Sequence, residues 1–566
     1  MWKQKLVMAA WLLSLPLLFA VQARAEATLY SGGFIYARAG LESPEALVVR
    51  DGNFAYAGKL EEALGVCGSK CQRVDLAGRM LAPSFFDAHA HPNLGVIFDL
   101  RDLPYRDKLP TPAEYVEHIR QYLLQHPETR VLRGVGWDNA AFRQGPPDKA
   151  LLDQVSRDIP IFLRSSDQHS AWVNSKALEL GGIDRHTPNP SGGLIERDAG
   201  GQPGGTLRDG ASNFIEAALP PLSVDENKAL ILKFQDMAHS LGITAYMCAM
   251  VMPRSTLYTA YRELLAEGRL KTYTQLAFMM TPDTYQDALA WLAQEVADYE
   301  ATRSGDLLGF RLAKFFMDGT IIGQSAYLLE DYAARPGYRG ESQWPPDVLQ
   351  AAFQLCEQQG IRIHVHVIGD AAAQLALDKL ETLTRPNRHA LTHLEVIRPE
   401  DIARFKASGL IATLNPYWFC KSLVWKDVEL AHLGPERAER MLPARAFLDA
   451  GVPVAAASDY PVTAVPNPLI GMEMAVSRTL IAAWRDGRSA EACMLNPGQA
   501  LAPEQALDAF TFTAAYAYGL EQLTGSIEQG KSADFVVLDR NILTGPSSEA
   551  RVLETWFRGQ LVYQAR

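Results

Sequence analysis

The sequence predicts an α/β protein: a (β/α)8 TIM barrel, a composite β-sandwich domain from both termini, and a long insertion after the first barrel strand. Strand-like and helix-like segments alternate through the middle of the 566-residue chain. Both ends of the chain are instead rich in short strands. The gap between the first barrel strand, which ends near residue 91, and the next one, which begins near residue 242, is too long for one crossover connection.

Residues 1–25 have the features of a secretory signal peptide. Lys3 and Lys5 precede the apolar run LVMAAWLLSLPLLFAV, and Ala23-Arg24-Ala25 has the small-x-small pattern of a signal-peptidase site. The apolar run is short for a membrane-spanning helix and contains a proline. We therefore expect cleavage after Ala25, a periplasmic or secreted protein, and no membrane association of the mature chain.

Two terminal parts, residues 26–82 and 524–566, consist of short strands separated by turn residues, which predicts one β-sandwich built from both. Of the six cysteines, Cys67 and Cys71 lie in a turn-like segment. They either form a disulfide in an oxidising compartment or remain free thiols, since three intervening residues make a tight loop. The other four lie in apolar runs and are expected in the core.

The part between them, residues 83–523, is predicted to form the barrel, interrupted by an insertion at about 100–235. Amphipathic segments such as PPDVLQAAFQLCEQQG separate the strand-like ones. The eight expected strands lie in the segments 81–92, 242–250, 272–280, 310–318, 361–370, 390–396, 410–418 and 453–461.

Metal-ligand residue types occur where these strands end. In LAPSFFDAHAHP, the two histidines are separated by one residue, so on a strand they share a face. A single histidine at a strand end is more often a core residue, and an aspartate often only caps a turn. Because a barrel brings all its strand ends together, the whole set predicts one binuclear hydrolytic centre. Such a centre takes four histidines, one lysine and one carboxylate, and the seven candidates at the strand ends are His89, His91, Lys314, His364, His366, His393 and Asp459.

The motifs DAHAH, KFFMDGT, HVIGDAA, SDYPV and NPLIGMEMAVSR resemble those of the amidohydrolase superfamily, and more narrowly its YtcJ-like, N-substituted formamide deformylase branch (amidohydrolase family 3). GWDNAAF and HSAWVNSKAL in the insertion and GSIEQGKSADFVVLD in the tail extend the resemblance over essentially the whole mature chain. The resemblance implies a divalent metal, usually Zn²⁺, at one or two ions per chain, and no other cofactor. It implies one ion on His89, His91 and Asp459 and a second on His366 and His393.

The resemblance also implies that Lys314 bridges the two ions as an N-carboxylated lysine. An ordinary ammonium, with a pKa near ~10.4, would repel a cation, whereas a carbamate adds negative charge and two oxygens. An unmodified Lys314 would instead leave a mononuclear site. His364 shares a strand face with His366 but lies outside the family motif, so it is the weaker candidate ligand. The chain departs from the family pattern, without loss of a ligand, at Ser84, Gln168, Thr392 and Asn415.

Aromatic and polar residues supply candidate pocket walls. Those in the insertion are Trp137, Asp138, His169, Trp172 and Asn174. The alternative for the two tryptophans is that they pack the insertion's own core. Three further candidates follow strand ends: Tyr417, Trp418 and Tyr460. Asp318 and Gly319, beside the predicted bridging lysine, either support the site or only shape a turn.

The predicted function is hydrolysis of a non-peptide carbon–nitrogen bond, in an amide, N-substituted formamide or cyclic amide, with Asp459 as general base. Alternatives are an ester or lactone hydrolase or an isomerase on the same site, and a non-catalytic periplasmic metal- or ligand-binding protein. A net charge of −11 without a basic run argues against nucleic acid as a partner. We expect a small-molecule substrate, and a homodimer is the candidate oligomer.

Overall fold

The computed structural model describes residues 27–93, 111–137, 141–142, 145–165, 170–190, 193–302, 306–384 and 387–566. The predicted signal peptide lies outside the described residues, as do the pocket candidates Asp138 and His169. Within the described residues, no helix is both long and apolar enough to span a bilayer.

An eight-stranded parallel sheet forms the centre of the molecule, with the strands in sequence order from one edge to the other. Its strands are β7 (Phe85–Ala90), β13 (Ile243–Val251), β14 (Tyr273–Met279), β15 (Leu308–Phe316), β16 (Arg362–Val367), β17 (Ala390–His393), β18 (Ile411–Leu414) and β19 (Val454–Ala456). Just past the strand ends, Asp459 N–H donates to His89 O at 2.8 Å and His91 N–H donates to Tyr460 O at 2.7 Å, which brings the last strand against the first. The predicted barrel fold is confirmed.

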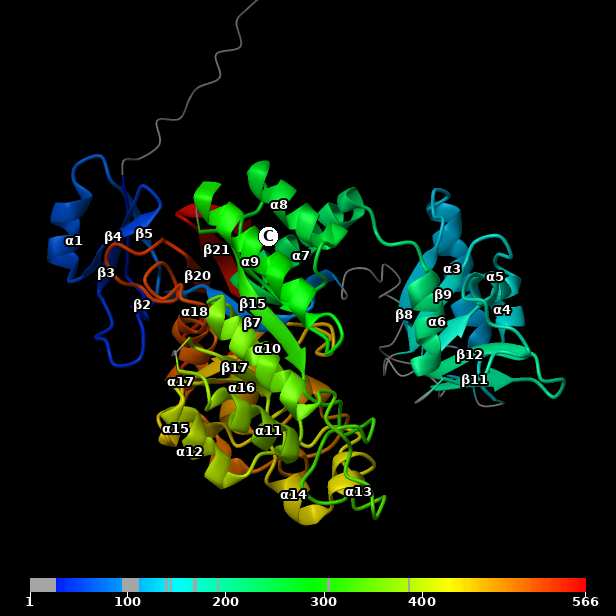
Figure 1. Ribbon diagram of the computed structural model, residues 1–566. Coiled ribbons are helices and arrows are strands. Elements are labelled where there is room, and N and C mark those ends of the chain that lie inside the picture. Colours follow the sequence, from blue (N-terminus) through cyan, green and yellow to red (C-terminus); the bar gives the residue numbers. More distant parts are fainter. Residues whose placement is uncertain are drawn as a thin grey trace, which may run out of the picture.

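Helices cover the outside of this barrel, in yellow, green and orange in Figure 1. The longer ones are α7 (Val224–Ser240), α8 (Thr256–Ala266), α9 (Tyr285–Thr302), α10 (Pro346–Gln358), α11 (Asp370–Leu380), α12 (Pro399–Ala407) and α16 (Pro468–Ser477). Shorter ones include α13 (Glu429–Leu433), α14 (Pro435–Glu439), α15 (Ala444–Asp449), α17 (Pro503–Ala509) and α18 (Phe512–Ala517). Helix α7 begins with a capping box in which Ser223 and Glu226 satisfy each other's free backbone N–H groups.

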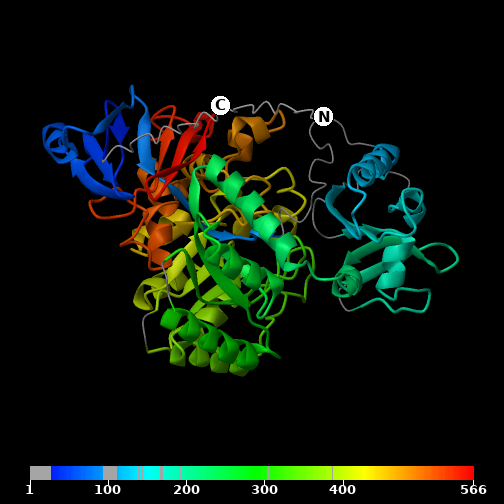
Figure 2. The ribbon, with the colours of Figure 1, turned by 90° about the horizontal axis from the view of Figure 1, so that it is seen from above.

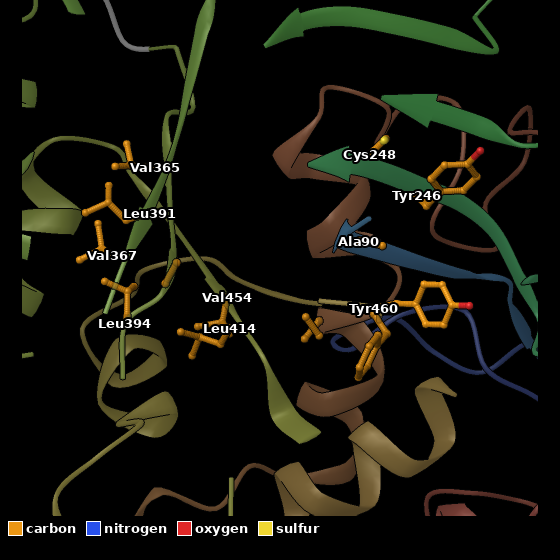
Figure 3. Packing of buried hydrophobic residues seen from close by; sticks show 14 of the residues in the cluster. Ala90, Tyr246, Cys248, Val365, Val367, Leu391, Leu394, Leu414, Val454 and Tyr460 are labelled. Atoms are coloured by element: carbon orange, nitrogen blue, oxygen red, sulfur yellow. The ribbon is translucent and has the colours of Figure 1, made fainter. Parts of the chain in front are cut away.

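Apolar side chains on the outer surface of the strands pack against these helices. Nearly every residue of β16 and β17 is buried, as expected for strands covered on both faces. Figure 3 shows Val365, Val367 and Leu391 from these strands in the same hydrophobic cluster as Tyr460, and Tyr460 is 1% exposed. The core therefore fixes the strand ends that carry the predicted site.

Both chain ends contribute to two further sheets. One has the order β4-β3-β1-β5 and the other the order β2-β6-β20-β21-β22. Their N-terminal strands are β1 (Thr28–Ser31), β2 (Phe34–Ile35), β3 (Ala46–Arg50), β4 (Asn53–Gly58), β5 (Gln72–Asp75) and β6 (Met80–Pro83), and helix α1 spans Leu60–Cys67. The C-terminal strands are β20 (Phe535–Leu538), β21 (Val552–Phe557) and β22 (Gln560–Gln564). Tyr30 and Phe535 meet between the sheets with ring centroids 5.2 Å apart, and Cys67 and Cys71 form a disulfide.

The insertion folds into a separate sheet of order β11-β12-β10-β9-β8, in cyan in Figures 1 and 2 and set apart from the barrel in both views. Its strands are β8 (Leu132–Trp137), β9 (Ile161–Ser165), β10 (Ser170–Val173), β11 (Gly193–Arg197) and β12 (Pro203–Asp209). Its helices are α3 (Pro112–Gln125), α4 (Lys149–Asp153), α5 (Ser175–Leu180) and α6 (Asn213–Ala218).

Candidate functional site

The C-terminal ends of the barrel strands surround a cavity of about 480 Å³. All six predicted ligands line it, although they come from five different strand ends: His89, His91, Lys314, His366, His393 and Asp459. None of the six is more than 9% exposed. The structure therefore brings together every residue of the predicted metal set.

Asp459 contacts the two other residues predicted to bind the first ion. Its Oδ1 is 3.3 Å from His89 Nε2 and 3.2 Å from His91 Nε2. Ligand atoms of His89, His393 and Asp459 lie within 4.8 Å of one another, close enough to share one ion. Burial alone would raise the pKa of Asp459, but the neighbouring side chains of His91, His393 and Lys314 hold it below its ordinary value.

Lys314, His366 and His393 are the remaining predicted ligands. Lys314 Nζ is 3.4 Å from His89 Nε2 and 4.6 Å from the centre of the Phe316 ring, with no exposed surface. Burial lowers the pKa of Lys314 to about 7. The rings of His366 and His393 are 4.7 Å apart, and burial lowers the pKa of both imidazoles, to about 3 for His366.

These residues suit a divalent cation. Burial keeps the imidazoles of His89, His366 and His393 neutral. A neutral imidazole nitrogen and a carboxylate oxygen are ligands that Zn²⁺ and related ions accept. Asp459 Oδ1 and His91 Nδ1 are buried without a hydrogen-bond partner among the described residues. Buried polar atoms of this kind are costly unless something else contacts them, so the set fits a metal centre.

Hydrogen bonds orient two of the imidazoles. His89 Nδ1 lies 2.7 Å from His364 Nε2, and His393 Nδ1 lies 2.8 Å from Asn415 Oδ1. Each contact occupies Nδ1 and leaves Nε2 free to face the cavity, which is how supporting residues fix a metal-binding histidine. His364 therefore contacts a predicted ligand instead of lining the cavity, and Asn415, noted only as a departure from the family pattern, supports another.

The backbone is strained at this edge of the barrel. His393, Leu394 and Asp459 have φ of 75°, 52° and 55°, in the left-handed region that non-glycine residues rarely adopt. Strain of this kind persists where the surrounding structure enforces it, commonly at active sites. Two of the three residues are predicted ligands.

Asp318 shapes the neighbouring loop. It accepts backbone hydrogen bonds from Tyr327, Ile368 and Gly369 at 2.8–3.0 Å, and burial raises its pKa to about 7. The carbonyl of Gly319 lies 3.2 Å from His366 Nε2. Both residues thus hold the loop around His366, a role the sequence had left open between support and a simple turn.

Asp87 joins the first barrel strand to the segment that carries Asp459. It accepts hydrogen bonds from Ser458 N–H at 2.9 Å, from the Ser458 hydroxyl at 2.5 Å and from His89 N–H at 3.3 Å. Asp87 has 1% exposure, and burial raises its pKa to about 7. The sequence analysis did not assign this residue a role, although its position in DAHAH was the available signal.

We expect Ser458→Ala to lower the free energy of unfolding by about 1–3 kcal/mol, because it leaves a buried carboxylate oxygen of Asp87 without its hydroxyl donor. Urea unfolding at constant metal concentration measures this as a lower midpoint with an unchanged slope. The matched control is Ser43→Ala, at an exposed serine, which should leave the midpoint unchanged. Equal midpoints for the two variants would show that the Asp87 bond contributes nothing.

Several predicted pocket residues lie elsewhere. Trp137 and Trp172 have no exposed surface; their indoles donate to Leu163 O and Asp148 O within the insertion's own core. Asn174 caps helix α5 by accepting from Ala177 N–H. These three therefore do not line the cavity: the two tryptophans fill the insertion's own core, and Asn174 caps one of its helices.

Tyr460 is also not a pocket residue, because its ring packs 5.6 Å from Phe234 in the barrel core. Tyr417 and Trp418, in the short helical turn η3 (Pro416–Trp418), do line the cavity. Trp418 stacks on His393 with ring centroids 5.4 Å apart.

The cavity wall contains two carboxyl groups that the sequence analysis missed. Glu395 and Glu429 line it together with apolar residues. Burial, and then the charge of Glu429, raises the pKa of Glu395 to about 8. A glutamate in a loop and one in the short helix α13 belong to no motif, so the sequence carried no signal for them.

Comparison with known proteins agrees with this geometry. The chain is 29% identical over 563 residues to the YtcJ protein of Bacillus subtilis, covering 95% of this chain and 99% of that one. It is 28% identical to the N-substituted formamide deformylase of Arthrobacter pascens, covering 92% and 95% of the two chains. A solved metal-dependent hydrolase from Pyrococcus furiosus, at 24% identity, superimposes with a TM-score of 0.74 over 92% of this chain and all of that one.

The first of these relatives matches over nearly its whole length, and the solved structure shares the fold. A family model described as "Amidohydrolase family" matches residues 72–563, which include the terminal strands, the barrel and every predicted ligand. By this match the chain belongs to the amidohydrolase family.

Proposed function

We propose that the protein hydrolyses a non-peptide carbon–nitrogen bond, such as that of an amide, an N-substituted formamide or a cyclic amide. The observation that carries the proposal is the position of Asp459, whose carboxylate lies 3.2–3.3 Å from two histidines at the base of the cavity. Relatives named for C–N bond chemistry, including the formamide deformylase of Arthrobacter pascens, support the same reaction class.

In this proposal His89, His91 and Asp459 would hold one Zn²⁺, His366 and His393 would hold a second, and Lys314 would serve both as its N-carboxylated form. The contact of Lys314 Nζ with His89 supports the bridging position. When bound, a divalent ion supplies an activated water and polarises the scissile carbonyl.

In this proposal, side chains of the protein transfer the proton of the attacking water. Asp459 accepts it from the attacking water through the carboxylate oxygen that is not engaged with the histidines and delivers it to the leaving nitrogen. Its lowered pKa keeps it ionised and able to act as a base. Trp418 and Tyr417 form part of the wall that excludes bulk water from this step.

The test is turnover by the purified chain supplemented with Zn²⁺, on a panel of N-formyl amines, N-acyl amines, cyclic amides and matching esters. We expect amide or formamide hydrolysis, with stoichiometric release of amine. Turnover of esters or lactones alone would favour the alternative hydrolase on the same site. Bound metal without turnover of any panel member would favour a binding protein.

The proposal includes export from the cytoplasm after cleavage behind Ala25. The disulfide between Cys67 and Cys71 supports it, because disulfides persist in oxidising compartments. N-terminal sequencing of the exported chain would test the cleavage site. We further propose a small-molecule substrate and a homodimer, and light scattering would measure the oligomeric state.

A further inference from the structure

The cavity above the proposed metal centre has an uneven wall. Most of the lining is apolar or aromatic, including Phe316, Ile321, Trp418, Trp425 and Leu480. Two carboxyl groups, from Glu395 and Glu429, interrupt it. Such a wall suits an apolar ligand with one polar end.

The two carboxyl groups have no cationic partner in the cavity. Among the described residues that line it, Lys314 is the single lysine or arginine, and it lies against His89. Outside the lining, Lys421 bonds to Glu439 at 2.7 Å, and Arg488 donates to the carbonyls of Ser422 and Lys421. Neither carboxyl group therefore has a lysine or arginine partner within the described lining.

Several buried polar atoms of the same wall are unpaired. Glu429 Oε2, Trp425 Nε1 and Tyr417 Oη have no hydrogen-bond partner among the described residues. Trp425 and Tyr417 are only 7% and 5% exposed, so bulk water does not readily solvate them. Buried groups left unpaired in the free protein commonly bind a ligand's polar atoms.

Glu429 is placed to meet a cationic group. Its Oε2 is buried without a partner among the described residues, and Glu395 lines the same cavity. A cation bound there would give the buried carboxylate the partner that it lacks in the free protein.

We propose that the substrate carries an apolar substituent ending in a protonated amine, which Glu429 binds with support from Glu395. This inference rests on the proposed function in placing the scissile bond at the metal centre. It adds the chemical class of the group at the other end of the substrate. A neutral substituent of the same shape would leave the carboxylates buried and unpaired, so the cavity should discriminate against it.

The first experiment measures binding without turnover. Calorimetric titration of the Zn²⁺-supplemented full chain compares 4-methylbenzylamine with 4-methylbenzyl alcohol, which have the same shape and differ in charge. We expect the amine to bind about 10- to 100-fold more tightly, the range of a charge-assisted hydrogen bond. In Glu429→Gln this preference should largely disappear, and in Glu395→Gln it should fall.

Glu436→Gln is the matched control, because it removes the same charge from the exposed start of the next helix, where Glu436 pairs with Arg440. It should keep the wild-type preference, and thermal unfolding checks that all three variants are folded. Equal binding of the amine and the alcohol by the wild type would overturn the proposal. A preference that survives in Glu429→Gln would also overturn it, since the amine would then bind elsewhere, such as at the metal.

The second experiment compares kcat/KM for N-(2-phenylethyl)formamide and its 4-(aminomethyl) derivative. We expect the charged substrate to be preferred, by a ratio that Glu429→Gln lowers about 10- to 100-fold. Turnover of both without preference would overturn this inference and leave the proposed function standing. Absence of turnover together with selective amine binding would instead leave the inference standing and count against the proposed function.

Discussion

Asp459→Asn should reduce kcat by roughly 10²- to 10⁴-fold, the usual contribution of a general acid–base group, while leaving the fold intact. The amide keeps the size of the carboxylate and the oxygen that faces His89 and His91, but it accepts no proton at neutral pH. The other carboxylate oxygen is replaced by an NH₂ group, which donates hydrogen bonds and cannot take up or deliver the proton.

The measurement is kcat on whichever panel amide the wild type hydrolyses, with the metal content of both proteins determined in parallel. Asp401→Asn is the matched control, because Asp401 is also buried but pairs with Arg398 and Arg404 at helix α12, outside the barrel. It should affect stability more than turnover. Near-wild-type kcat for Asp459→Asn with normal metal content would exclude Asp459 as the base.

Asp459 should also determine how activity and stability depend on pH. The pKa of Asp459 in the folded state is depressed. Its ionised form therefore contributes stability above the ordinary carboxyl pKa, and this contribution is lost as the pH falls through the depressed value. The acid limb of kcat/KM should therefore lie below the pH at which an unperturbed aspartate titrates. Asp459→Asn should abolish that limb.

The barrel was predictable because its strands are short apolar runs separated by amphipathic segments, a pattern that parallel sheets require. The ligands were predictable for a related reason: a barrel must bring its strand ends to one place, so His89 and Asp459 could be joined across some 370 residues of chain. Sequence spacing alone could not distinguish His364 from His366, since both point to one face. The structure separates them, because His364 bonds to His89 and His366 lines the cavity.

The pocket was much harder to predict. An indole such as Trp172 serves a core or a pocket equally well, and only the insertion's tertiary packing determines which. Tyr460 directly follows Asp459, yet the turn there directs its ring away from the cavity and toward Phe234. Glu395 and Glu429 come to line one cavity only through the tertiary fold, which local sequence does not encode.

Lys314→Met should lower the bound metal from two ions per chain to one and reduce kcat/KM about 10²-fold or more. Methionine has nearly the shape of lysine, so the fully buried position stays filled, but it forms no carbamate. The ligands of the first ion remain, whereas the second ion is left with the imidazoles of His366 and His393 and no anionic ligand. An ion held by two neutral ligands alone binds weakly.

Two readouts check this expectation independently of activity. Elemental analysis counts the ions per chain, and intact-mass measurement under native conditions detects one added carboxyl group on the wild type but not on Lys314→Met. A wild type with a single ion, unchanged by the substitution, would assign Lys314 a purely structural role. The site would then be mononuclear, built on the His89, His393 and Asp459 cluster, whose ligand atoms already lie within 4.8 Å of one another. Either result would leave Asp459 as the base, because its contacts with His89 and His91 do not pass through Lys314.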